Sequence, residues 1–233
     1  MTNKAYTDLL ALLGIGGAHP GGIELTKTIL LKESLEDKKL LEIGCGTGQT
    51  SLFLHAMNVD ITPIDNHPIM IKKANHRLAE QQADIKALQM DIEETEFGDS
   101  TFDLILSESV LSFTNTVKTL PELHRLLKAD GVLLAFEMTK KDTMQHELED
   151  RMKQFYNMPN IFSKKDWKEA LEQCGFKKVE ITPLAIGELE PSEPDINPSE
   201  IIEEKYFEVM HQHEQLTYES QEHIELSVIR AQR

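Results

Sequence analysis

The sequence predicts an α/β protein built on a doubly wound, mostly parallel sheet with helices on both faces. Two observations support this fold class. Between residues 39 and 136, short apolar segments alternate with helical patterns, and such alternation places successive strands side by side in parallel. At residues 40–48 an apolar strand pattern leads into three glycines and then into a helical pattern, an arrangement that makes a binding edge for nucleotide-like ligands.

Apolar runs and helical periodicities define the expected elements. We expect strands at residues 39–43, 59–64, 85–90, 102–107, 132–136, 176–186 and 223–231. We expect helices at residues 5–13, 23–31, 49–57, 143–156, 163–175 and 198–214, and a leucine stripe at 120–127 that stops near Gly131. The acidic, proline-containing residues 187–197 are expected to form an exposed loop.

Two of these helices carry specific expectations. A helix follows Asn66, which is a favourable N-cap, and its expected buried side consists of Ile69, Ile71, Ala74 and Leu78. In the helix at 198–214, the expected contacts are Ile201, Ile202, Phe207 and Met210.

The glycine-rich segment at residues 14–22 lies between the first two expected helices. Five of its nine residues are glycine, so regular structure is not expected there. Two interpretations are open: a flexible connector, or a lid that closes on a ligand. The constrained pair His19-Pro20 is unusual for a simple linker.

Length and composition are consistent with one large domain. The chain has 233 residues, of which 40% are hydrophobic, and it holds no apolar run of 18 residues that would suggest a transmembrane helix. The N-terminus has no signal-peptide layout, and the only two cysteines, Cys45 and Cys174, suggest no disulfide framework. We therefore expect a cytoplasmic protein.

Charge limits the expected partners. The formal net charge of −16 repels phosphate backbones, which argues against a nucleic-acid substrate. The nine histidines are scattered, and no metal site is expected. His211 and His213 would diverge on a helix, so both are expected at the surface.

The glycine turn at residues 44–48 reads Gly-Cys-Gly-Thr-Gly. Glycine accepts a positive φ and, lacking a Cβ, lets a ligand lie against the backbone. The dinucleotide fingerprint of nicotinamide enzymes requires its third glycine at the position of Gln49, so the spacing argues against that cofactor. A tight turn that binds nothing is the other interpretation.

Acidic residues follow two further expected strands. Asp65 ends the strand at 59–64, where a carboxylate can accept both hydroxyl protons of a ribose. Asp91 follows the strand at 85–90. Taken singly, Asp65 could instead be a helix cap, and Asp91 a turn residue.

Together these features resemble the class I S-adenosylmethionine-dependent methyltransferases in order and spacing. The features are Glu42 with the glycine turn, Asp65, Asp91, the strand at 102–105 and the turn at 126–133. The resemblance is strong over residues 40–136 and weaker to the end of the chain. It implies a seven-stranded sheet whose last strand is antiparallel.

The resemblance also implies one methyltransferase domain over residues 1–233. Residues 1–36 would form an N-terminal helical and glycine-rich lid segment, and residues 37–137 the cofactor-binding core. Residues 138–233 would supply C-terminal helices and a strand pair.

Site residues are carried over from the family position by position. Gly44, Gly46 and Gly48 would make room for the methionine part of the cofactor, with Glu42, Cys45 and Thr47 beside them. Asp65 would take the ribose hydroxyls. Around the adenine, the resemblance implies Asn66 on its flank, Asp91 at its amino group and the backbone of Ile92. Ser107 and Glu108 would line the methyl-transfer site.

The expected function is methyl transfer from S-adenosylmethionine to a small-molecule acceptor by in-line displacement, which leaves S-adenosylhomocysteine. Such a reaction depends mainly on alignment and on exclusion of water. A general base is needed only if the acceptor must lose a proton, and the candidates are His19, Glu108 and Tyr156. The alternative is a catalytically silent member that binds the cofactor and acts through a protein partner. The acceptor and the oligomeric state stay open.

Overall fold

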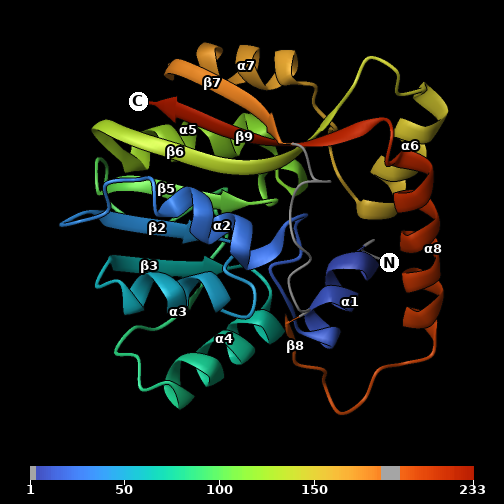
Figure 1. Cartoon of the computed structure of the whole chain (residues 1–233), viewed down its shortest axis with the longest axis horizontal. Helices are drawn as coiled ribbons and strands as arrows, with labels where there is room; N and C mark the ends of the chain where they lie inside the picture. The colour runs from blue at the N-terminus through green and yellow to red at the C-terminus, as the bar shows by residue number, and fades with distance from the viewer. Residues whose placement is uncertain (1–3, 185–194) are drawn as a thin grey trace.

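The fold is a seven-stranded sheet with helices on both faces (Figure 1). The computed structural model describes residues 4–184 and 195–233. The strands of this sheet are β2 (Lys39–Ile43), β3 (Asp60–Asp65), β4 (Leu88–Gln89), β5 (Phe102–Glu108), β6 (Leu127–Lys140), β7 (Lys177–Leu184) and β9 (Ile224–Gln232). Their order is β4-β3-β2-β5-β6-β9-β7, and β9 runs antiparallel to both of its neighbours. The predicted fold class is confirmed.

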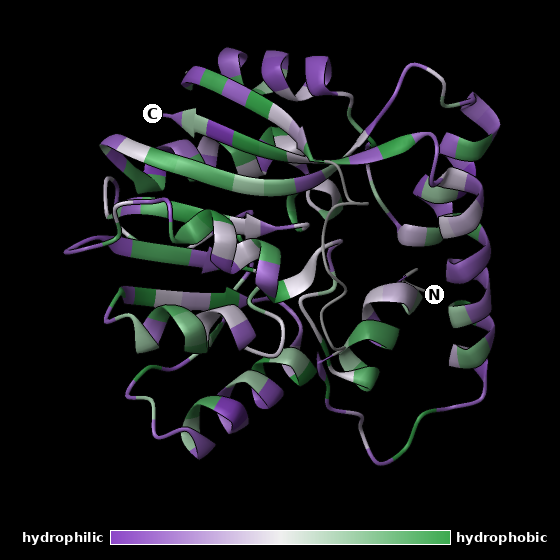
Figure 2. Cartoon of the chain, viewed as in Figure 1, coloured by the Kyte–Doolittle hydropathy of each residue, from purple (hydrophilic) through white to green (hydrophobic). Residues whose placement is uncertain are grey.

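Alternate residues of the central strands face opposite sides of the sheet. Leu40 packs with helices α2 (Gly22–Leu30) and α3 (Gln49–Ala56) on one face. Its neighbour Leu41 packs with α5 (Thr116–Leu126) and α7 (Lys164–Gln173) on the other face. Helices cover both faces, and hydrophobic residues recur along the central strands β5 and β6, whereas the edge strand β7 alternates between hydrophilic and hydrophobic residues (Figure 2).

A third apolar cluster lies beyond the carboxyl edge of the strands. It is formed by helices α1 (Ala5–Leu13), α6 (His146–Tyr156) and α8 (Lys205–Ser220), seen on the right of Figure 1. Its buried members are Tyr6, Met152, Tyr156, Ile161 and Leu216. These helices therefore face the end of the sheet where the glycine turn lies.

The glycine-rich segment contains regular structure, contrary to the prediction. Its strand β1 (Ile15–Gly16) pairs antiparallel with β8 (Asp195–Ile196). A Cβ on Gly16 would collide with the Asp195 carboxylate and the Thr47 hydroxyl, so glycine is required at this crossing. Asp195 in turn accepts hydrogen bonds from Arg77 of α4 (Pro68–Glu80) at 2.6 and 2.8 Å.

The last helix begins later than predicted, at Lys205 instead of residue 198. The backbone N–H groups of Asn197 and Ser199 donate to carbonyls of Gly14 and Leu12, which holds this stretch extended against the N-terminal segment. Ile201 and Phe207, which were predicted to make contacts, are exposed. The buried residues of this helix include Tyr206 and Leu216 instead.

Smaller corrections have local causes. The N-cap of α4 is His67, not Asn66, because Nδ1 of His67 accepts from the Ile69 N–H at 3.3 Å. On the buried side of α4, Met70 takes the place predicted for Ile69 and Ile71. Strand β4 has two residues because the backbone of Ala87 bonds to the side chain of Asn75 instead of to a neighbouring strand.

Strand β6 begins at Leu127, where the leucine stripe was predicted to continue to a stop near Gly131. The predicted end of the strand at 176–186 and most of the predicted loop, residues 187–194, lie outside the described residues. Within residues 4–184 and 195–233, none of the helices combines the length and the apolar character needed to cross a bilayer.

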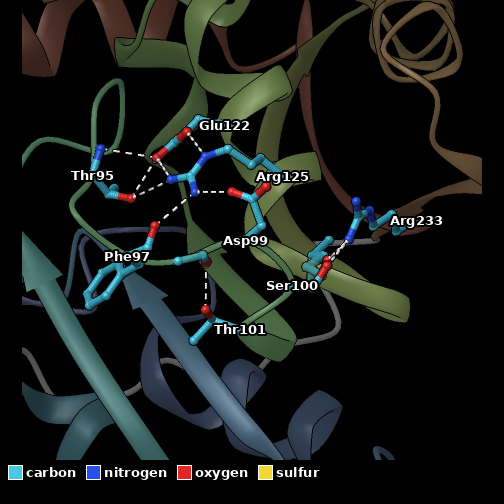
Figure 3. A network of polar contacts seen from close by, with 10 residues as sticks. Thr95, Phe97, Asp99, Ser100, Thr101, Glu122, Arg125 and Arg233 are labelled. Carbon is cyan, nitrogen blue, oxygen red and sulfur yellow. Dashed lines mark hydrogen bonds and ion pairs between the residues drawn. The ribbon is translucent and has the colours of Figure 1, made fainter.

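A polar network secures the amino edge of the sheet, opposite the glycine turn (Figure 3). Arg125 at the end of α5 donates to the Phe97 carbonyl at 2.8 Å, to Asp99 at 2.7 Å and to Glu122 at 2.7 and 2.8 Å. These bonds hold the loop that enters β5, and they raise the pKa of the Arg125 guanidinium while lowering the pKa of Glu122.

We expect Arg125→Ala to lower the free energy of unfolding by about 2 kcal/mol, because it removes charge-assisted bonds to three partners. For a chain of this size, that corresponds to a drop of about 4–8 °C in Tm, measured by thermal melting. Arg151→Ala is the control: Arg151 is exposed and forms a surface ion pair with the exposed Glu219, so its loss should leave Tm nearly unchanged. Equal Tm values for the two variants would contradict the assigned importance of the Arg125 network.

Candidate active site

A cavity with a volume of about 870 Å³ lies at the carboxyl ends of the strands. Strand β2 leads outward to β3 and β4 on one side and neighbours β5 on the other, so the strand order reverses between β2 and β5. Ligands of open α/β sheets bind at this reversal, outside the carboxyl ends of the strands. The cavity extends from there to the apolar cluster of α1, α6 and α8.

The glycine turn forms the floor of the cavity. Gly44, Cys45 and Gly46 line it directly. Gly46 has a φ of 53°, and a Cβ built on it would meet no atom within 4 Å, so the backbone is open to a ligand at this point. Thr47 is buried behind the turn with its hydroxyl 3.4 Å from Asp195, and Gly48 is the residue before α3.

Four acidic side chains reach the cavity from four strands: Glu42, Asp65, Glu108 and Glu137. Glu42 is fully enclosed and accepts a 2.5 Å bond from Ser51. Burial, and then the neighbouring Glu108, raise the pKa of Glu42 well above its usual value. The carboxylates favour a positively charged ligand, because a cation would relieve their mutual repulsion.

Asp65 stands at the end of β3, beside the glycine turn. Its carboxylate accepts from the Gly46 N–H at 2.9 Å and from the His67 N–H at 2.8 Å. Burial raises the pKa of Asp65, and these two hydrogen bonds oppose the shift. A carboxylate has about four acceptor positions, so two are left for a diol.

Glu108, at the end of β5, connects the glycine-rich segment to the sheet. Its Oε2 accepts from Thr26 at 2.5 Å and lies 2.7 Å from Nε2 of His19. The other ring nitrogen of His19 lies 3.1 Å from the Pro20 carbonyl, and only 5% of His19 is exposed. His19 therefore holds the segment over the cavity and has no ring nitrogen free for an acceptor.

Glu137 is a site residue that sequence reasoning missed. It accepts from three consecutive backbone N–H groups, those of Val110, Leu111 and Ser112, and from the Ser112 hydroxyl. Burial raises the pKa of Glu137 to about 7, against the lowering effect of these bonds. An acidic residue in the apolar run 132–138 was the available signal.

Tyr156 lies on the far wall of the cavity, at the end of α6. Its hydroxyl is 3.0 Å from Nδ1 of His213 on α8. His213 was predicted to be a surface residue; it instead lines the cavity, because its ring packs against Tyr6 of α1 and Tyr156 of α6.

Of the remaining predicted site residues, Asp91 and Ser107 are not among those that line the cavity. Asn66 and Ile92 line it. Asp91 is exposed, and its carboxylate accepts from the Glu93 N–H at 2.9 Å. Ser107 is fully buried with its hydroxyl toward Glu137, so Glu108 is the nearer of this pair to the cavity.

Comparison with known proteins decides the family. A family model described as "Methyltransferase domain" matches residues 34–177, more than half of the chain. The chain belongs to the class I S-adenosylmethionine-dependent methyltransferases. The predicted family and cofactor are thereby confirmed.

Two curated relatives of this methyltransferase are similar over much of its length. An uncharacterised methyltransferase of Bacillus subtilis strain 168, YodH, is 35% identical over 214 residues, 91% of each chain. A malonyl-[acyl-carrier protein] O-methyltransferase of Paenibacillus sp. strain JDR-2 is 32% identical over 172 residues, 67% of this chain and 62% of the relative.

The fold has a solved counterpart in a phosphoethanolamine N-methyltransferase of Haemonchus contortus, bound to phosphomonomethylethanolamine and S-adenosylhomocysteine. The TM-score is 0.74 at 17% identity, and the likeness covers 99% of this methyltransferase and 56% of the nematode protein. At that identity the likeness shows the shared fold.

The cavity of the methyltransferase fits S-adenosylmethionine. The open backbone at Gly46 leaves room for a ligand chain, and Asp65 has acceptor positions to spare. The buried carboxylates suit a cofactor that carries a sulfonium and an ammonium group.

Replacing Glu137 should disrupt the segment that it anchors. Glu137→Leu leaves three backbone N–H groups without an acceptor, so we expect a loss of about 3 kcal/mol or more in unfolding free energy, measured by denaturant titration. Glu137→Gln retains one carbonyl acceptor and should lose less. Glu180→Leu, at an exposed position of β7, is the control. A Glu137→Leu variant as stable as this control would contradict the anchoring role.

Removing the His19 ring should loosen the glycine-rich segment. We expect His19→Ala to speed amide hydrogen exchange of residues 15–22 about tenfold, because a buried, charge-assisted bond to Glu108 is lost. His76→Ala, at an exposed position of α4, should leave this exchange unchanged. Unchanged protection in His19→Ala would mean that the pairing of β1 with β8 is sufficient.

Proposed function

We propose that this methyltransferase transfers the methyl group of S-adenosylmethionine to a small-molecule acceptor held in the same cavity. The supporting observation is the cavity itself, which joins the glycine turn to an apolar wall within about 870 Å³. Ligand pockets span about 300–1,000 Å³, and this cavity lies near the upper end of that range, which is consistent with a cofactor and a compact acceptor.

Some residues of the chain would bind the cofactor, and others would enclose the reacting groups. Gly44, Gly46 and Asp65 would hold the methionine and ribose parts of the cofactor, and Asp91 would accept from the adenine amino group. When bound, the cofactor supplies an electrophilic methyl group on a sulfonium. The acceptor would attack in line with the departing sulfur, so the main task of the site is alignment and exclusion of water.

The N-terminal and C-terminal segments would close this site. Residues 1–36 and 138–233 would cover the core at residues 37–137, with the glycine-rich segment as the lid. The bond from His19 to Glu108 supports this division, since it joins the segment to β5 at the edge of the cavity. The Thr26 hydroxyl reinforces the same carboxylate.

The net charge of −16 and the names of the relatives support a small acceptor over a nucleic acid. A catalytically silent protein that binds the cofactor and acts through a partner is the second candidate. Production of S-adenosylhomocysteine from purified protein with an acceptor panel separates the two, because the silent protein would bind the cofactor without turnover.

Asp65→Ala should weaken S-adenosylmethionine binding about 10- to 100-fold, because hydrogen bonds from the ribose to a charged group are lost. Calorimetric titration measures the affinity, and thermal melting reports whether the fold is kept. Asp60→Ala, at the exposed start of the same strand, is the matched control. Unchanged affinity in a folded Asp65→Ala variant would rule out the ribose assignment.

A further inference from the structure

The cavity has two chemically different ends. The four carboxylates lie at the strand ends around the glycine turn. The opposite end is formed by aromatic and aliphatic side chains from α1, α6, α8 and the loops beside them: Tyr6, Phe113, Met152, Met158, Ile161 and Ile224. If the first end holds the cofactor, the second end is where the acceptor lies.

Tyr156 and His213 are a hydrogen-bonded polar pair within this apolar end. The Tyr156 hydroxyl lies 3.0 Å from Nδ1 of His213, and both residues line the cavity. Burial raises the pKa of the Tyr156 hydroxyl, and burial lowers the pKa of the His213 imidazole. A protonated tyrosine and a neutral imidazole are compatible with a bond in which the Tyr156 hydroxyl donates to Nδ1 and the ring proton lies on Nε2, which is the arrangement that a proton relay requires.

Few charges act on His213. The rings of Tyr6 on α1 and Tyr156 on α6 contact it, and Glu214 on its own helix acts on it electrostatically. Glu214 is exposed. The pair is thus an uncharged hydrogen-bonded chain that runs from the Tyr156 hydroxyl to the basic Nδ1 of His213.

The aromatic residues do not form an open cage for an ammonium group. Tyr6 and Phe155 pack against the ring of Tyr156 with centroids 4.8 Å away, and His213 lies 4.9 Å from the ring of Tyr6. Both contacts to Tyr156 are edge-to-face, so these rings pack against one another. The surface favours an uncharged, apolar acceptor.

We propose that Tyr156 and His213 form a proton relay for a phenolic hydroxyl on an apolar acceptor. This inference rests on the proposed function, since it concerns the acceptor of the same reaction. The acceptor oxygen forms the new bond to the methyl carbon, and the carbon–sulfur bond breaks with its electron pair left on sulfur. The hydroxyl proton passes to the Tyr156 oxygen while the Tyr156 proton passes to Nδ1 of His213.

The base strength of an imidazole limits which hydroxyl groups the relay could deprotonate. An imidazole can assist the loss of a proton from a phenol, whose pKa is about 10, as in tyrosine. An aliphatic alcohol is far less acidic. The relay therefore assigns aromatic hydroxyl compounds as the substrate class, because an amine attacks through its lone pair and would leave the relay without a role.

The first experiment compares acceptors of matched shape. Purified full-length protein is incubated with S-adenosylmethionine and either umbelliferone and naphthol or the corresponding amine, naphthylamine, and S-adenosylhomocysteine is measured. We expect methylation of the hydroxyl compounds alone. Methylation of the amine alone, or of neither class by protein that binds S-adenosylmethionine in calorimetry, overturns the relay. Absence of cofactor binding would instead overturn the proposed function.

The second experiment separates base chemistry from structure. His213→Asn retains a hydrogen-bond acceptor but no basic nitrogen, and Tyr156→Phe retains the ring. We expect each variant to lower turnover of umbelliferone about 100-fold or more, with cofactor affinity unchanged. His211→Ala, exposed on the same helix, should behave as wild type. Turnover of His213→Asn within a factor of about three of wild type overturns the relay.

Two measurements distinguish the loss of a basic nitrogen at position 213 from a displacement of α8. The deficit of His213→Asn should shrink with para-nitrophenol, which ionises without assistance near neutral pH, and as the pH is raised. In addition, umbelliferone bound with S-adenosylhomocysteine should show more of its fluorescent anion in wild type than in His213→Asn. An equal deficit with both phenols, together with equal anion fractions, contradicts proton transfer to His213.

Discussion

The need to partner buried carboxylates at one edge of the sheet controls the arrangement of the site. Parallel strands bring Glu42, Asp65, Glu108 and Glu137 to the same edge, where burial without hydrogen bonds would be costly. Their donors come from the glycine turn, the glycine-rich segment, α2 and α3, and the residues after β5. Each acid is therefore bonded to a different segment around the cavity. The positions of these segments and of the carboxylates depend on each other.

The same carboxylates give the cavity its polarity. One end is acidic and suits the cationic cofactor of the class I methyltransferases, whereas the other is rich in aromatic and aliphatic side chains and contains the Tyr156–His213 pair. A methyl group would pass from the first end to the second, which is consistent with the proposed small-molecule acceptor. The glycine-rich segment belongs to both ends, because it bonds to Glu108 and also follows directly on α1.

Much of the core was predictable because its signals are local. The strands β2 and β5 and the turn at residues 44–48 follow from apolar runs and glycine spacing, and the strand–helix alternation implies a parallel sheet. The predictions that were wrong concern segments held by distant partners. The start of α8 depends on bonds from Asn197 and Ser199 to the N-terminal segment, and no periodicity in residues 198–214 contains that information.

By itself, the sequence determined the fold class, the family resemblance and the strand ends that carry Asp65 and Glu108. These features depend on short-range periodicity and on the fixed geometry of a parallel sheet. Only the tertiary structure showed that Glu137 anchors the residues after β5 and that His213 faces the cavity. Both facts arise from contacts between residues far apart in the chain, since hydrogen-bond partners and helix rotation are set by packing.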